Sequence, residues 1–333
     1  LDRIMACLKE ENLYAVELGG VKPNPRSGLV YEGIELCRRE KIDFVLAVGG
    51  GSVIDTAKAI AIGVPYDGDF WDFFSGKMPE QALPVGTVLT IAASGSEGSP
   101  DSIITNEKTQ EKTGIFFTSM FPTLSIVDSN LMMSVPPKFT AYQGMDAFYH
   151  ASESVINKNE HPMGEMFALK AIKLIARYLP AAYRDGSDKE ARAYVALANT
   201  LAGYYMLCTS QHTMEHVMGG YHDDLVHGAG LIMISHAYFD FFAERKAAEE
   251  AMIKMAKAMG VENPTSGKDF IRALDNLIAA VGCDNLRMSD AGITKEELKK
   301  YPKRVHEVLG GDITADPLPL SDADYLAIYE KSY

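Results

Sequence analysis

Predicted strands and helices alternate through the first third of the chain. Residues 44–48 form a continuous apolar run that suits a buried parallel strand, and residues 15–18 are expected to form another strand, which ends in glycine. Further strands are predicted over 85–91 and 124–128. Helical spacing follows residues 44–48, so strand and helix succeed each other as in a βαβ unit. We therefore predict an α/β region with a parallel sheet.

Long helical patterns replace the strands after residue 137. A chain of 333 residues exceeds the size at which one hydrophobic core usually stops growing. We therefore predict an α/β domain over 1–135 and an all-helical domain over 136–333. The expected helices of the second domain span 140–156, 163–178, 189–216, 228–244, 246–259 and 267–281, with Pro162, Pro180 and Pro264 separating several of them.

Composition and charge narrow the class of partner. The hydrophobic fraction of 47% and the charged fraction of 23% are those of an ordinary globular protein. A net charge of −13 argues against a nucleic-acid or membrane partner, and no apolar run is long enough to span a bilayer. The four cysteines form no C-x-x-C pair, so we expect a reducing, cytoplasmic setting without a disulfide framework.

A glycine turn at 49–52 follows the strand predicted over 44–48. It opens a predicted helix, where backbone N–H groups and the helix dipole attract phosphate and the missing side chains permit close approach. Ile54 occupies the third glycine position of the G-x-G-x-x-G pattern, so a plain tight turn is the alternative. The small-residue loop 90–97 follows another predicted strand, and two such loops at strand ends favour a cofactor cleft.

The histidines are unevenly distributed. None occurs in the first 149 residues, whereas seven of the eight fall in the middle of the chain. Asp146 and His150 are four residues apart, as are His212 and His216, and His227 follows them. Residues at this spacing share one face of an α-helix. Carboxylate and imidazole ligands without thiolate suit Fe(II), Zn(II), Co(II) or Ni(II), so the pattern predicts a metal site.

Residues 212–216 also match H-x-x-E-H, a zinc-peptidase pattern. In that pattern the two histidines hold the metal and the glutamate, here Glu215, is the general base. A metal-dependent hydrolase is therefore one alternative function. It leaves the glycine turn and the pair Asp146 and His150 without a role.

Taken together, several segments resemble the iron-containing (group III) alcohol dehydrogenase family, and in particular its butanol-dehydrogenase-like members. The resemblance runs through essentially the whole chain, in order, and is far more specific than any single motif. The matching segments are GVKPNP (20–25), AVGGGSVIDTAK (47–58), TIAASGSE (90–97), SVPP (134–137), GMDAFYH (144–150) and HGAG (227–230).

The resemblance implies a dehydroquinate synthase-like architecture: an N-terminal Rossmann-like dinucleotide-binding domain with a parallel sheet, an all-α C-terminal domain and a cleft between them. It implies Fe(II), with Zn(II) as an alternative, NAD or NADP, a small alcohol or aldehyde substrate, and a homodimer. The implied metal ligands are Asp146, His150, His212 and His227. The implied cofactor contacts are Asn24, Gly50, Gly51, Ser52, Asp55, Thr90, Ser94 and Lys112.

The expected reaction is reversible hydride transfer, with the metal polarising the substrate oxygen. His216 is expected beside the metal, where it relays the alcohol proton or positions a ligand. The loop 219–226 is longer than in the best-known members, which leaves open whether His212 or His216 is the ligand. Family members also carry a strand, a turn and a helix before the segment that begins here, so part of the sheet and of the adenosine site is expected to be missing. A metal-binding remnant without turnover is the third candidate function.

Overall fold

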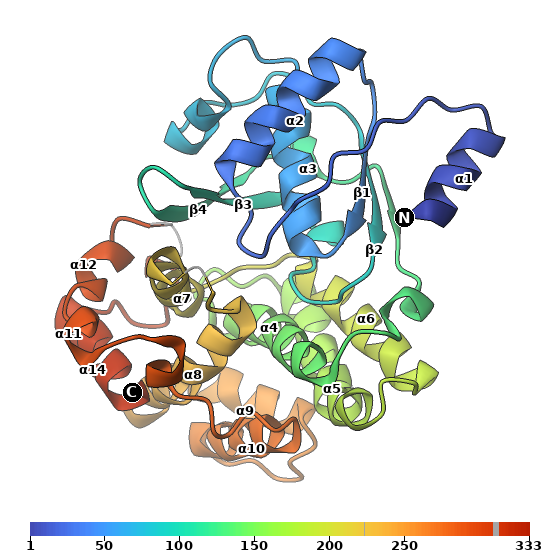
Figure 1. Cartoon of the computed structure of the whole chain (residues 1–333). Coiled ribbons are helices and arrows are strands. Elements are labelled where there is room, and N and C mark those ends of the chain that lie inside the picture. The colour runs from blue at the N-terminus through green and yellow to red at the C-terminus, as the bar shows by residue number, and fades with distance from the viewer. Residues whose placement is uncertain (223, 309–312) are drawn as a thin grey trace.

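A small parallel sheet forms the centre of the upper part of the molecule (Figure 1). The computed structural model describes residues 1–222, 224–308 and 313–333. The strand order is β1-β2-β5, and Val45 of β1 lies opposite Val85 of β2. Because the strands are parallel, their carboxyl ends share one edge, where ligands bind in open α/β sheets. The strands are β1 (Val45–Gly49), β2 (Val85–Leu89) and β5 (Leu124–Ile126).

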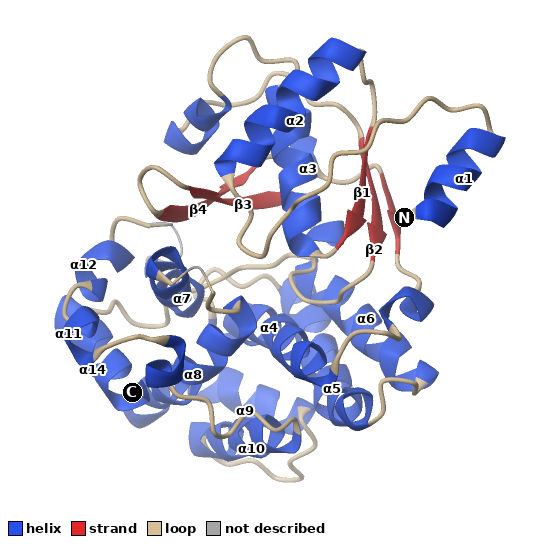
Figure 2. Ribbon diagram, viewed as in Figure 1, coloured by secondary structure: helices blue, strands red, loops and turns tan. Residues whose placement is uncertain are grey.

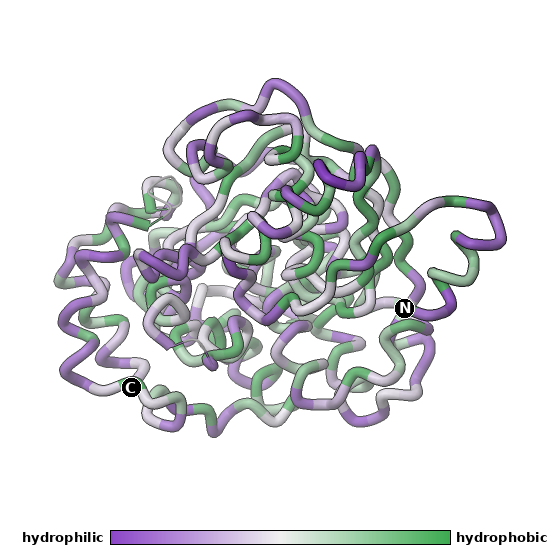
Figure 3. The backbone as a smooth tube through the Cα atoms, turned by 45° about the horizontal axis from the view of Figure 1, so that its top comes forward, coloured by the Kyte–Doolittle hydropathy of each residue, from purple (hydrophilic) through white to green (hydrophobic). Residues whose placement is uncertain are grey.

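Two helices pack against each other beside this sheet, α2 (Ser27–Glu40) and α3 (Gly51–Gly63). They approach closely through glycine, since a Cβ atom on Gly33 would lie 2.3 Å from Ile60 Cδ1. Every residue of α3 from Ile54 to its end is buried, which makes it the central helix of this part. In contrast, α1 (Asp2–Glu10) buries no residue and projects from the body in Figures 1 and 3.

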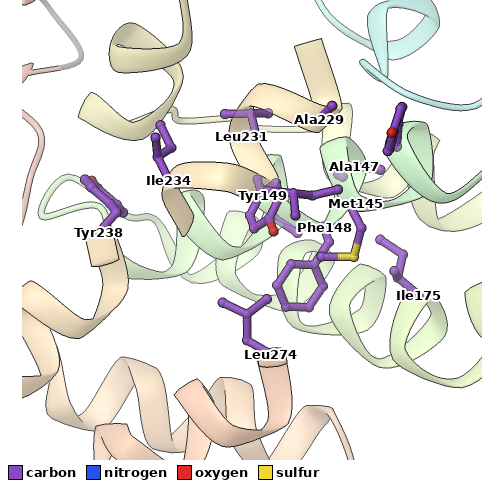
Figure 4. Packing of buried hydrophobic residues seen from close by; sticks show 14 of the residues in the cluster. Met145, Ala147, Phe148, Tyr149, Ile175, Ala229, Leu231, Ile234, Tyr238 and Leu274 are labelled. Atoms are coloured by element: carbon purple, nitrogen blue, oxygen red, sulfur yellow. The ribbon is translucent and has the colours of Figure 1, made fainter. Parts of the chain in front are cut away.

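Helices make up the lower part of the molecule, from residue 137 onward. α4 is central to it: Met145, Phe148 and Tyr149 lie among buried side chains of α5, α8 and α10 (Figure 4). Among the described residues, no helix is both long and apolar enough to cross a membrane. The helices are α4 (Pro137–Ile156), α5 (Pro162–Arg184), α6 (Lys189–Gly203), α7 (Ser210–Tyr221), α8 (His227–Arg245), α9 (Glu249–Ala258), α10 (Gly267–Ala280), α11 (Lys295–Leu298), α12 (Tyr301–Val305) and α14 (Asp322–Ser332).

A β-hairpin connects the two parts. β3 (Asp101–Asn106) and β4 (Glu111–Phe116) pair antiparallel, apart from the parallel sheet (Figure 2). β3 contacts α3, and β4 contacts α7, so the hairpin reaches from the sheet side to the helical side. Short 3₁₀ helices lie at Phe70–Ser75, Ser96–Gly98, Thr118–Met120, Ser129–Met132 and Met288–Ala291.

The predicted fold class, a parallel α/β region followed by helices, is confirmed. The strand predicted over 15–18 is wrong. A strand needs a neighbour to take its backbone hydrogen bonds, and no described strand pairs with this segment. Its Leu18 packs instead with the apolar side chains of α2 and α3. The boundary near Val135 stays a prediction.

Two helix predictions are also wrong. The helix expected over 189–216 is divided into α6 and α7, because the chain turns through a left-handed residue, Tyr205, with φ 54°. Pro180 does not end a helix but lies inside α5. The apolar face continues past it, since Leu179 and Ala182 are buried and a Cβ atom on Gly144 of α4 would lie 2.2 Å from Leu179 Cδ1.

Candidate metal and cofactor site

The glycine turn joins β1 to α3 at the carboxyl edge of the sheet. Gly50 is extended, with φ −91° and ψ −170°, and α3 begins at the next residue. A Cβ atom on Gly51 would lie 2.2 Å from Ser94 Oγ, so the turn touches the loop that follows β2. Only glycine fits this contact without displacing Ser94, and the turn leaves the N-terminus of α3 accessible to an anion.

A cleft with a volume of about 330 Å³ runs from this turn to the helices, a size suited to part of a small-molecule ligand. It brings together the predicted cofactor residues of the sheet side and the predicted metal residues of the helical side. Thr90 is the exception: it is not among the described residues that line the cleft, and its amide donates to Gly49 O at 2.9 Å. The predicted residues that line the cleft are Asn24, Gly50, Gly51, Ser52, Asp55, Ser94, Lys112, Asp146, His150, His212, His216 and His227.

Asp55 lines the cleft, but its carboxylate is engaged within the protein. It accepts hydrogen bonds from Ser96 Oγ at 2.6 Å and from Ile103 N at 3.2 Å. Burial raises its pKa to about 7, although Lys58 opposes the shift. Lys58, which the sequence patterns did not single out, is fully buried and donates to Ser96 O, Ser96 Oγ, Ser99 O and Asp101 O at 2.7–2.9 Å. These bonds fix the loop after β2 against α3.

Four predicted metal ligands converge from three helices. Asp146 and His150 share one face of α4, His212 is in the first turn of α7, and His227 is the first residue of α8. Asp146 Oδ1 lies 3.8, 3.6 and 3.5 Å from the Nε2 atoms of His150, His212 and His227, respectively. A tetrahedral metal with bonds of about 2.1 Å sets its ligands about 3.4 Å apart. The spacing therefore fits a shared ion.

The hydrogen bonding at this cluster also fits a metal. Asp146 Oδ1 and His212 Nε2 are buried without a hydrogen-bond partner among the described residues, which is costly unless another group binds them. The pKa of Asp146 lies well below its usual range: burial opposes ionisation, but His150 and His227 outweigh it. Burial lowers the pKa of His150 and of His227, and Lys112 adds to the effect at His227. The ionised carboxylate and these two neutral imidazoles are in metal-ligating forms. The pKa of His212 is instead raised well above its usual value: burial opposes the rise, but Cys208 and Glu153 outweigh it, so this ring must release a proton when a metal binds.

Two fully buried glutamates contact the other nitrogen of these rings. Glu153 Oε1 contacts His212 Nδ1, and its Oε2 accepts from Thr209 N at 2.7 Å and Thr209 Oγ1 at 2.9 Å. Glu215 Oε2 contacts His227 Nδ1. The sequence patterns did not identify Glu153, although it lies three residues after His150 on α4, which is a detectable helical spacing.

His216 is buried at the cleft, and its ring centroid lies 5.4 Å from that of His227. Its Nδ1 has no hydrogen-bond partner in the described part of the chain. Burial, followed by the charge of Lys112, lowers its pKa well below the usual value, so the ring is neutral near pH 7. It makes none of the three close contacts with Asp146 Oδ1 that His150, His212 and His227 make.

The peptidase pattern does not fit this geometry. A general base must face the site where a water molecule or substrate binds. Glu215 is fully buried, is absent from the described lining of the cleft, and is engaged by Lys112 and His227. The H-x-x-E-H spacing thus places its glutamate behind a ring and not at an open position.

Comparison with known proteins identifies relatives over the whole chain. A model of the family described as iron-containing alcohol dehydrogenase matches residues 1–129, and one described as the C-terminal region of the Fe-containing alcohol dehydrogenase family matches residues 140–333. "Probable NADH-dependent butanol dehydrogenase 2" of Bacillus subtilis (strain 168) is 37% identical, with 90% of this chain and 79% of that protein covered. NADH-dependent butanol dehydrogenase A of Clostridium acetobutylicum is 32% identical, with 100% and 88% covered.

A solved structure agrees with these matches. The crystal structure of the archaeal halo-thermophilic Red Sea brine pool alcohol dehydrogenase ADH/D1 superimposes with a TM-score of 0.93 at 30% identity. The match covers 100% of this chain and 87% of that one, so both the sheet side and the helical side share its fold.

Proposed function

Because the chain belongs to the iron-containing alcohol dehydrogenase family, we propose that it transfers hydride between NADH and a small aldehyde, in a reversible reaction that forms the alcohol. The observation that carries this proposal is the cluster at Asp146, where three imidazole nitrogens surround one buried carboxylate oxygen. The named activity of the relatives, NADH-dependent butanol dehydrogenase, supports the choice of cofactor and substrate class.

Asp146, His150, His212 and His227 are the proposed ligands of Fe(II). The contact of 3.6 Å between His212 Nε2 and Asp146 Oδ1 supports His212 over His216 as the ligand on α7. When bound, the metal supplies a Lewis acid for the substrate oxygen, and the nicotinamide supplies the hydride. With one carboxylate and three neutral imidazoles, the ligand set leaves a divalent ion with net positive charge, as that task requires.

The cofactor-binding role falls to the residues at the carboxyl edge of the sheet. Gly50, Gly51 and Ser52 offer backbone N–H groups at the start of α3, where a pyrophosphate is stabilised. Ser94 borders the same turn, and Asn24 and Lys112 line the cleft beside it. Asp55 supports this edge by holding Ser96 and Ile103.

His216 is the proposed proton carrier. Its ring borders the cleft and is neutral near pH 7, so a ring nitrogen can take up a proton. A neutral imidazole accepts the alcohol proton during oxidation and, once protonated, returns it during reduction. We further propose that the protein is a homodimer, which the family resemblance supports. A cytoplasmic location is also proposed, and the four described cysteines, none of which forms a disulfide, support it.

The metal requirement gives the first test. Metal-free protein is loaded with Fe(II) under anaerobic conditions, and NADH consumption with butyraldehyde is followed at the nicotinamide absorbance band. His227→Ala should lower kcat/KM at least about 100-fold, because a ligand is lost. His236→Ala on the same helix is the matched control, since His236 is exposed and paired with Asp275.

Equal activity of His227→Ala and wild type would contradict the ligand assignment. Activity in the metal-free protein would contradict the proposed role of the metal. Peptide cleavage without NADH would favour the hydrolase instead.

A further inference from the structure

Glu215 lies between a cation of the hairpin and a ring of the metal cluster. It is the glutamate of the H-x-x-E-H segment on α7 and is fully buried. Its Oε2 accepts from Lys112 Nζ at 3.0 Å and contacts His227 Nδ1. Lys112 Nζ is itself 3.3 Å from His227 Nδ1. The proposed dehydrogenase reaction gives this glutamate no task.

The two nitrogens of His227 face different partners. Nε2 lies 3.5 Å from Asp146 Oδ1 on the metal side, whereas Nδ1 is against Glu215. A neutral imidazole carries its proton on one nitrogen only, and a carboxylate beside Nδ1 keeps that proton there. Nε2 then keeps the lone pair that a metal needs. The carboxylate also restrains the orientation of the ring, as such groups do around protein-bound metals.

The same arrangement occurs a second time at this site. Glu153 on α4 contacts Nδ1 of His212 on α7, while Glu215 on α7 contacts Nδ1 of His227 on α8. A carboxylate of α4 therefore holds a ring of α7, and a carboxylate of α7 holds a ring of α8. His150 lacks such a partner, since its Nδ1 has no hydrogen bond to any described residue.

Lys112 extends this chain of contacts to the sheet side. It belongs to β4, and both Lys112 and Glu215 are almost entirely removed from solvent. A buried carboxylate without a cation nearby is costly, and removal of one partner leaves the other uncompensated. Lys112 thereby allows an ionised carboxylate to stand behind His227.

We propose that Glu215 is a positioning residue that holds His227 in its metal-binding tautomer and orientation, with Lys112 of the hairpin as the counter-ion that permits it. The inference deepens the proposed function, on whose metal site it rests. It also accounts for the glutamate of the H-x-x-E-H segment without hydrolytic chemistry.

Co(II) binding to the metal-free protein tests this role without any turnover. Visible absorption of Co(II) reports both affinity and ligand geometry. Glu215→Leu should weaken Co(II) binding about 10- to 100-fold and alter the spectrum, because Nδ1 loses its acceptor. Glu215→Gln retains an acceptor oxygen without the charge, so its affinity should fall between those of Glu215→Leu and wild type. Apo-protein melting temperatures identify any variant that merely fails to fold.

Lys112→Met provides the decisive comparison. It keeps the acceptor but removes the counter-ion that the proposal requires, so Co(II) should bind more weakly than in wild type. Glu215→Leu also leaves the buried Lys112 without its carboxylate partner. If that were the only cause of weaker binding, the double variant Glu215→Leu/Lys112→Met would regain affinity for Co(II). We expect the double variant to stay weak. Recovery in the double variant, or wild-type affinity in Glu215→Leu, would overturn the proposal.

The outcome also separates this inference from the proposed function. Wild-type protein that binds no Co(II) would contradict the metal site itself, and the role of Glu215 with it. Wild-type binding with an unaffected Glu215→Leu would contradict the positioning role alone and leave the dehydrogenase proposal intact.

Discussion

At the scale of single residues, the cleft is surrounded by buried polar groups that have different tasks. Lys58 has four backbone and hydroxyl acceptors and serves the loop after β2. Asp146 Oδ1 has none among the described residues and faces three imidazoles instead. Burial of both groups is costly, so the difference in their partners separates a structural residue from a ligand.

The buried carboxyl group of Asp316 makes the free energy of unfolding depend on pH. It is buried beside the start of α7, where its Oδ1 accepts from Ser210 N at 3.1 Å and Tyr238 OH at 2.6 Å. Burial raises its pKa to about 6. The folded state therefore binds this proton more tightly than the unfolded state, and the free energy of unfolding falls as pH rises from about 4 through 6, by about 3 kcal/mol. Asp316→Asn should reduce the fall seen in urea unfolding curves by this amount, while the contribution of Asp55, whose pKa is also raised, remains.

The control for this prediction is Asp67→Asn at an exposed position, which should retain the wild-type pH-dependence. If Asp316→Asn and wild type lose the same stability between pH 4 and 7, the raised pKa of Asp316 is refuted.

At the scale of elements, local patterns were sufficient for β1, the glycine turn and α3, because strand, turn and helix are contiguous there. The division between α6 and α7 could not be predicted in this way. The amide and hydroxyl of Thr209, just before α7, bond to Glu153, which is 56 residues away on α4. A cap supplied by another helix leaves no signal in the local sequence.

In the candidate site, too, local sequence patterns predicted some features and could not predict others. The spacing of Asp146 and His150, and of His212 and His216, identified the helix faces that approach one another. The contacts of Glu153 and Glu215 with ring nitrogens depend on how α4, α7 and α8 pack, which spacing does not specify. The hairpin that carries Lys112 was likewise missing from the predicted elements, although Lys112 itself was named through the family resemblance.

The contact between α6 and the loop after β2 gives a prediction at this scale. A Cβ atom on Gly203 would lie 2.4 Å from Gly95 O, and Gly95 itself has φ +67°. Gly203→Ala must push the loop away, and Ser94 of that loop lines the cleft. We expect the free energy of unfolding to fall by about 2 kcal/mol and the KM for NADH to rise.

Gly19→Ala is a suitable control, because Gly19 is exposed and its added Cβ would meet nothing closer than Glu17 Oε1 at 4.0 Å. Thermal unfolding and NADH kinetics of both variants provide the comparison. A Gly203→Ala protein with wild-type stability would show that the loop is not held by this contact.

At the scale of the whole molecule, each part supplies one half of the proposed reaction. The carboxyl edge of the sheet provides the glycine turn, and α4, α7 and α8 provide the ligand cluster. The cleft is lined by both, so a cofactor on one side and a substrate on the other can meet there. The hairpin strand β4 reaches from the sheet side to the helical side and places Lys112 against Glu215 of α7.

The fate of the transferred hydrogen tests the dehydrogenase proposal most directly. The Fe(II)-loaded protein is given butyraldehyde and NADH that carries deuterium on the reactive face of nicotinamide C4, and the butanol is analysed by mass spectrometry and NMR. Hydride transfer predicts one deuterium on the carbinol carbon, formed only when the metal is present. NADH prepared with the label on either face covers both stereochemical outcomes. Butanol without deuterium from both preparations, or metal binding with no butanol at all, would contradict the proposed reaction.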